Sequence, residues 1–192
     1  MNPITPTTEL EAVNGIISVI GELPIDDLRI ADTNADVKLA LQLLRGGTRS
    51  LQIRGWKFNT DEGVTLYRDP DGTIPLPTNC VRCVISEPGI DMTVRGQRIY
   101  NRTTHGYVWT QDLVCDLTSL LAFDELPEAV RSFLTEKIGQ KFQARAIGSP
   151  VLDSFTREDI EEAAVTLSEF ELDDGQYNFL TGSSSVTSAW TR

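Results

Sequence analysis

Apolar residues recur at two different spacings along this chain, and the change falls near Gly55. Before it, the members of one predicted helix face recur every three or four positions: Val37, Leu41, Leu44, Thr48 and Leu51. After it, the bulky residues are even numbers of positions apart, as on one face of a strand: Trp56, Phe58, Val64 and Leu66. Gly55 suits a helix C-terminus, where the backbone often takes positive φ. We therefore predict a structural joint of Gly55, Trp56 and Phe58 that fixes a helix to a sheet, with the Trp56 N–H needing an acceptor.

Apolar stripes and residues typical of helix ends predict four helices. They cover residues 8–20, 34–54, 127–147 and 156–174. Thr33 and Asp36 have the spacing of a capping box at the start of the second helix. Inside the same helix, Gly46 and Gly47 each cost about 1 kcal/mol relative to alanine. We therefore expect a kink or a close helix–helix approach there.

Between the second and third helices, turn residues separate short runs rich in Val, Ile, Thr and Tyr. Beyond the strand that follows Gly55, the predicted strands cover residues 81–85, 91–94, 98–101, 107–109 and 113–118. Their close spacing leaves no room for crossover helices, so it predicts an antiparallel meander.

The elements together predict an α+β fold. A four-helix bundle-like α domain (1–55 and 126–175) carries an inserted antiparallel β-sheet (56–125) between its second and third helices, and an extended C-terminal arm follows (176–192). The arm is mostly polar and cannot form a core of its own. It is either a disordered terminus or an arm that orders on a partner. In the second case its anchors are Tyr177, Phe179, Leu180 and Trp190.

The net charge of −11 and the isoelectric point near 4.5 argue against nucleic-acid binding as the main activity. An acidic wall instead lets a polyanion pass without binding to it. The three cysteines are an odd number, no signal peptide is visible, and no apolar run approaches the roughly 20 residues of a membrane span. We expect free thiols in a reducing compartment.

The cysteine pair Cys80-Val81-Arg82-Cys83 has the spacing of half a zinc site or of a redox pair. Further soft ligands are limited to Cys115 and His105, and the helix that normally follows a redox pair is missing. In an extended strand, positions three apart point to opposite faces. We therefore interpret both cysteines as small apolar strand residues and predict no metal or cofactor.

Other catalytic patterns are equally weak. His105 is the single histidine and lies in a predicted hairpin turn. The carboxylates are grouped at 124–125, 158–162 and 169–174, and those of the fourth helix largely fall off its apolar stripe. Arg45-Gly46-Gly47-Thr48 lacks the spacing and the lysine of a phosphate loop. We predict no catalytic residues.

With these elements in order, the chain resembles tail tubular protein A, the head-to-tail adaptor family of short-tailed phages with single-subunit RNA polymerases. The similar segments occur in the expected order along almost the whole chain. They are 11–14, 20–24, 34–36, 54–59, 62–66, 124–128, Glu169, Glu171, 175–180 and 191–192. Gly46-Gly47 departs from the family pattern, in which this part of the helix is continuous, and the region 69–115 matches less well.

The resemblance implies a structural virion protein without enzymatic activity, assembled in the host cytoplasm. The family forms a ring of twelve subunits between the portal protein and the tail nozzle, a protein of the tail tubular protein B type. Tail fibres attach around the junction, and DNA passes through the lumen during ejection, without sequence-specific or membrane binding. Two other functions stay open at this point: a tail-associated polysaccharide or peptidoglycan hydrolase that uses paired carboxylates, and a monomeric chaperone-like binding module.

Overall fold

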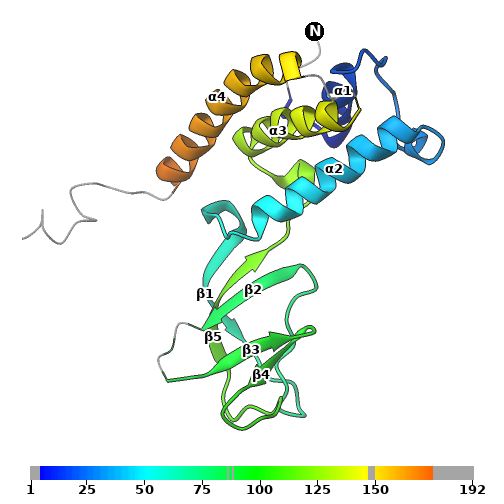
Figure 1. The fold of residues 1–192 in the computed structure, drawn as a ribbon. Helices are drawn as coiled ribbons and strands as arrows, with labels where there is room; N and C mark the ends of the chain where they lie inside the picture. Colours follow the sequence, from blue (N-terminus) through cyan, green and yellow to red (C-terminus); the bar gives the residue numbers. More distant parts are fainter. Residues whose placement is uncertain (1–4, 86, 88, 147–149, 175–192) are drawn as a thin grey trace, which may run out of the picture. The chain divides into compact units, whose positions relative to one another are not determined.

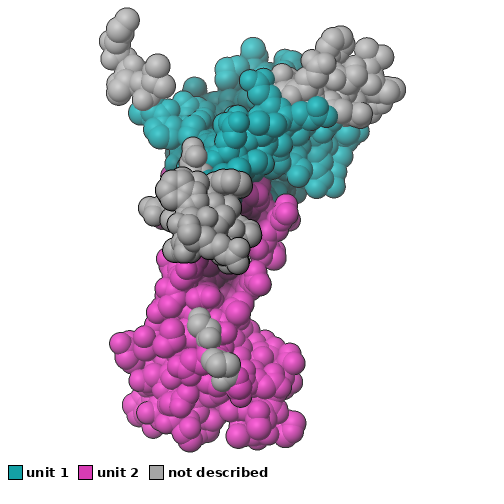
Figure 2. All heavy atoms as spheres, turned by 90° about the vertical axis from the view of Figure 1, so that its left-hand side faces the viewer, with its two compact units in different colours: residues 1–47, 126–192 teal, residues 48–125 magenta. Residues whose placement is uncertain are grey.

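A computed structural model describes residues 5–85, 87, 89–146 and 150–174, with the backbone alone at 150–159 and 173–174. The fold is a mixed α+β arrangement of helices and antiparallel sheets (Figure 1). The chain divides into two compact units, residues 1–47 with 126–192 and residues 48–125, coloured separately in Figure 2. We call them the helical unit and the sheet unit.

The helical elements begin and end close to the predicted positions, except at the start of the fourth helix, described below. Their bounds are α1 (Glu9–Ser18), η1 (Leu28–Asp32), α2 (Ala35–Gln52), α3 (Glu128–Ala146) and α4 (Pro150–Asp174). Thr8 caps α1: its hydroxyl accepts from the Glu11 N–H at 3.2 Å, and its own N–H donates to the Glu11 carboxylate at 2.8 Å. This reciprocal pair satisfies two of the donors that a helix N-terminus leaves without partners.

One predicted helix cap and one predicted helix start are wrong. Asn34, not a Thr33–Asp36 box, caps α2, because its side-chain oxygen accepts from the N–H groups of Asp36 (2.9 Å) and Val37 (3.2 Å). The fourth helix begins at Pro150 instead of Thr156. Proline lacks an N–H, but the first turn of a helix has no acceptor for one, so Pro150 can begin a helix as well as end one.

The paired glycines do not interrupt α2, which is one continuous helix from Ala35 to Gln52. One of them makes room for side chains of α3. A Cβ built at Gly47 would lie 2.7 Å from Cδ1 of Ile138 on α3, whereas one built at Gly46 would meet nothing within 4 Å. Gly47 therefore leaves room for the end of the Ile138 side chain, and Gly46 has no such role.

This difference gives a matched pair of variants. Gly46→Ala is expected to raise the free energy of unfolding by up to about 1 kcal/mol, because it improves helix propensity in open space. Gly47→Val should lower it by about 2 kcal/mol, because the branched side chain overlaps Ile138. Chemical denaturation of both variants measures the two changes in the free energy of unfolding. Equal effects at both positions would contradict the close contact between residue 47 and the Ile138 side chain.

In the helical unit, α3 contacts its neighbours on several sides. It packs on α4 and on α1, and Gly15 of α1 comes within 3.4 Å of the Thr135 side chain when a Cβ is added. Residues on much of its circumference are buried: Val130, Arg131, Phe133, Leu134, Ile138, Gly139, Phe142 and Gln143. A helix surrounded in this way has no wide polar face, in contrast to an ordinary surface helix.

Among the residues that the structure describes, the sheet unit holds five strands in two antiparallel sheets. The strands are β1 (Thr60–Leu66), β2 (Cys80–Ile85), β3 (Met92–Arg95), β4 (Arg98–Asn101) and β5 (Leu113–Ser119), with single-turn helices η2 (Lys57–Asn59) and η3 (Phe123–Glu125). One sheet has the order β1-β5-β2, and the other is the β3–β4 hairpin. The antiparallel prediction is confirmed. The meander is wrong, because the last strand, β5, lies between the first two and is the most completely buried of the three.

The predicted strand at 107–109 is not formed. The Trp109 backbone N–H instead donates to the Gly72 carbonyl at 2.9 Å, and its indole N–H donates to the Ile99 carbonyl at 3.0 Å. The indole thereby joins the core of the sheet unit, whose buried members are Leu66, Ile74, Leu76, Ile99, Trp109, Leu113, Cys115 and Leu117. A buried indole with a satisfied N–H contributes a large apolar area without an unpaired donor.

Candidate functional site

The predicted joint lies entirely within the sheet unit, which begins at Thr48 and so includes the last turn of α2. Gly55 has φ of 77°, as expected for a helix C-terminus, and its N–H donates to the Gln52 carbonyl at 3.1 Å. A Cβ at this position would lie 3.2 Å from the Thr118 hydroxyl of β5. Glycine is therefore favoured at position 55 for two reasons: its backbone has positive φ, and the Thr118 hydroxyl leaves little space for a side chain.

Trp56 and Phe58 do not lie in a strand, contrary to the prediction. Phe58 lies in η2, and β1 starts only at Thr60. The two rings stack with centroids 6.2 Å apart, and the Arg54 guanidinium lies 5.6 Å from the centre of the Trp56 ring. The indole N–H donates to the Leu51 carbonyl at 2.8 Å, which supplies the predicted acceptor. Trp56 thus covers the end of α2 and satisfies one of its last carbonyls.

Two residues that the sequence analysis did not single out make most of the joint's polar contacts. Gln52, fully buried, forms a two-way pair with the Leu121 backbone: its Nε2 donates to the carbonyl at 3.0 Å, and its Oε1 accepts from the N–H at 2.8 Å. Asn59, 4% exposed, donates from Nδ2 to the carbonyls of Gln52 (3.0 Å) and Ser119 (2.9 Å). Its Oδ1 accepts from the Trp56 N–H at 2.8 Å.

The two amides together connect the end of α2 to the end of β5. Hydrogen bonds of this kind are directional, and breaking a buried one leaves its partner unsatisfied. The joint therefore resists both rotation and separation of the helix end and the strand. One signal of it was present in the sequence: Gln52 lies four residues after Thr48, on the stripe that turns toward the interior.

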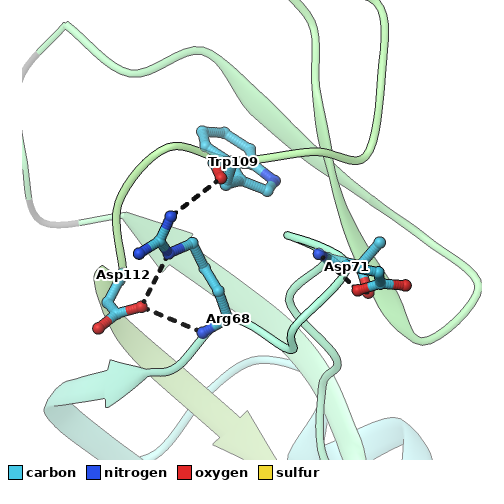
Figure 3. Close-up of polar contacts among 5 residues, drawn as sticks. Arg68, Asp71, Trp109 and Asp112 are labelled. Carbon is cyan, nitrogen blue, oxygen red and sulfur yellow. Dashed lines mark hydrogen bonds and ion pairs between the residues drawn. The ribbon is translucent and has the colours of Figure 1, made fainter.

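A second set of contacts fixes the long loops of the sheet unit (Figure 3). The carboxylate of Asp112 accepts from the Arg68 backbone N–H at 3.1 Å and from its Nε at 3.2 Å, and the same guanidinium donates to the Trp109 carbonyl at 3.4 Å. The Asp71 carboxylate accepts from the N–H and the hydroxyl of Thr73 at 3.0 and 2.8 Å. The donated N–H groups, and then the side-chain donors, hold the pKa of both aspartates below their usual value.

The cysteines lie differently from the prediction. An irregularity in the β2–β5 register between Cys80 and Arg82 adds a residue to β2, so Cys80 and Cys83 both pack against the core of the sheet unit instead of pointing to opposite faces. Cys115 is buried in the same core. A hydrogen bond with the Cys115 thiol, and burial, raise the pKa of Cys83, so this thiol is neutral at physiological pH.

His105 occupies an exposed turn with φ of 55°, between Asn101 and Gly106, whose backbones bond to each other. Asp124, Glu125, Glu161, Glu162 and Glu169 are exposed. Glu162 and Glu136 line an open groove of about 270 Å³ between α4 and α3.

Within the described residues, no three His, Cys, Asp or Glu side chains are grouped so as to hold a metal ion. None of the described helices is long and apolar enough to span a membrane.

The predicted partner-binding anchors Tyr177, Phe179, Leu180 and Trp190 lie outside the described residues. The features that the structure does place are those of a cross-linked scaffold: a helix end joined to a strand, and loops fixed by ion pairs and turns.

The sequence profile described as tail tubular protein matches residues 10–177, which is most of the chain. The chain belongs to the tail tubular protein family. The resemblance inferred from short segments is therefore confirmed at the level of the family. A comparison with curated proteins gave no match.

Membership of the tail tubular protein family identifies a structural component of a virion tail. The matched range, residues 10–177, includes the joint and the strands of the sheet unit. The hydrolase alternative has no support from this family or from the exposed carboxylates.

Proposed function

We propose that this tail tubular protein is the ring-forming adaptor between the portal and the tail nozzle. In this proposal about twelve subunits form the ring, tail fibres attach around it, and DNA passes through its lumen. The observation that carries the proposal is the family match over residues 10–177, which spans both units. The same proposal treats the helices as a four-helix bundle into which the sheet is inserted, and residues 176–192 as a partner-binding arm.

The physical properties of the chain agree with such a role. Each subunit of a connector under load must keep its shape. The amide of Asn59 joins the end of α2 to the last residue of the central strand β5, and the amide of Gln52 joins it to Leu121, two residues further on. A lumen that lets DNA pass must not retain it. The net charge of −11 disfavours strong phosphate binding, because like charges repel within about 8 Å at physiological salt.

The test is the native mass of the purified protein, alone and after mixing with the portal protein of the same phage. We expect portal-bound rings of about twelve subunits, visible by native mass spectrometry and by electron microscopy. A monomer that does not associate with the portal would contradict the proposal.

The arm is tested separately by a chain that ends at residue 175. If the anchors Tyr177, Phe179, Leu180 and Trp190 bind a partner, this truncation should weaken portal or nozzle binding at least about tenfold, since buried aromatic anchors dominate interface energies. Unchanged binding to both partners would remove the arm from the proposal without affecting the ring.

A further inference from the structure

The outward face of α2 is basic. Between Val37 and Thr60 the chain contains five Lys or Arg residues and no Asp or Glu. Four exposed residues on α2 recur at helical spacing: Lys38, Gln42, Arg45 and Arg49. Arg45 already forms a bidentate ion pair within the subunit: its Nε and Nη2 donate to the two carboxylate oxygens of Glu9 at 2.8 and 2.9 Å. Lys38 and Arg49 are the charges left to face outward, about 16 Å apart along the helix axis.

The outward face of α4 is acidic and partly apolar. From Glu158 to Asp174 this helix has eight acidic residues and no Lys, Arg or His. Among the described side chains, one exposed stripe consists of Glu161, Val165, Glu169 and Leu172. Val165 and Leu172 are 56% and 58% exposed, so this stripe carries two large apolar side chains about two turns apart.

Within the helical unit, α3 lies between α4 and the part of α2 that ends at Gly47. Ala129 and Ser132 of α3 line the groove with α4, whereas Leu134 and Ile138 approach Gly47 of α2. At about 100° per residue, Ser132 and Leu134 point in nearly opposite directions from α3. Within the helical unit, α4 and the part of α2 that ends at Gly47 therefore lie against different sides of α3 (Figure 1).

We propose that α2 of one subunit docks on α4 of the next copy of this chain, which makes the outward faces of α2 and α4 the two sides of the ring contact. Lys38 and Arg49 pair with Glu161 and Glu169, which are about 12 Å apart along their helix. The methylene stems of the basic side chains cover Val165 and Leu172. This inference rests on the proposed ring and names the surfaces that build it.

The charges of the two faces determine which face of the neighbouring subunit is bound. Two α2 faces repel each other, as do two α4 faces, so the symmetric dimers that would end assembly are disfavoured. Contact between unlike faces is heterologous. A heterologous contact produces a closed ring when the rotation from each subunit to the next adds up to a full turn. The same charges would make assembly weaker as the salt concentration rises.

The experiment uses two charge-reversed full-length proteins: one carries Lys38→Glu and Arg49→Glu, and the other carries Glu161→Lys and Glu169→Lys. Each alone brings like charges together at every contact. We expect each to form portal-bound rings at least about tenfold less efficiently than the unchanged protein, as judged by native mass and electron microscopy. In an equimolar mixture, alternating subunits restore attraction at every contact, so ring formation should return to within about threefold of the unchanged protein.

Recovery in the mixture also shows that both variants are folded. A matched control, Arg95→Glu at the end of β3 with Arg102→Glu just after β4, makes the same change of charge as the α2 variant at exposed positions that belong to neither proposed face, and it should assemble normally. The inference is overturned if the mixture fails while circular dichroism shows folded subunits. It is also overturned if the control loses as much assembly, or if the α2 variant keeps its rings and loses only retention of duplex DNA. If the unchanged protein makes no ring with the portal, the proposed function fails as well.

Discussion

Replacing Gln52 by leucine is expected to lower the free energy of unfolding by about 3 kcal/mol. Leucine has nearly the same size and suits a helix, so packing and helix propensity change little. The loss comes from the Leu121 backbone, whose N–H and carbonyl both bond to the Gln52 side chain, at 2.8 and 3.0 Å. Each buried group left unsatisfied costs about 1–3 kcal/mol.

The matched control is Gln42→Leu, which makes the same chemical change at an exposed position of the same helix. It should change stability by no more than about 0.5 kcal/mol. Urea denaturation followed by the fluorescence of Trp56 and Trp109, both in the sheet unit, measures the two variants. Hydrogen exchange at the Leu121 N–H should accelerate in the first variant alone. If Gln52→Leu were as stable as its control, the joint would not depend on this amide.

Replacing Gly55 by valine is expected to cost about 3 kcal/mol, from two separate causes. A branched residue at φ of 77° is strained by about 1–2 kcal/mol. Its Cβ would also lie 3.2 Å from the Thr118 hydroxyl on β5, where α2 and the sheet meet. Crowding of this kind adds about 1–3 kcal/mol.

Gly63→Val separates the two causes. Gly63 also has positive φ, at 68°, but a Cβ there meets nothing within 4 Å. This control should therefore show the backbone strain alone and lose about 1–2 kcal/mol in the same denaturation assay. Equal losses at the two glycines would mean that the close approach to Thr118 adds nothing.

The helices could largely be predicted from the sequence, because their signals are local. Thr8 and Glu11 are three residues apart, and the stripe of α1 recurs within a few turns. The errors arose where one local signal has two meanings. Pro150 ends one helix in the prediction and begins another in the structure, since its missing N–H suits either position.

The sheet was predicted less well, because strand order depends on contacts between distant segments. The positions of β2, β4 and β5 follow from their apolar runs, yet no local pattern indicates that β5 pairs with both β1 and β2. The additional residue between Cys80 and Arg82 likewise changes which face Cys83 occupies. Alternation along one strand holds only as long as its register is regular.

The α+β class, the family, the positive φ of Gly55 and the need of the Trp56 N–H for an acceptor could all be predicted from the sequence, since each depends on residue type and on near neighbours. That Gln52 and Asn59 hold the joint together follows from contacts between distant parts of the chain. Gln52 and Leu121 are 69 positions apart in the chain, and Asn59 and Ser119 are 60 apart. A buried amide is recognised by what surrounds it, and those surroundings exist only once the chain has folded.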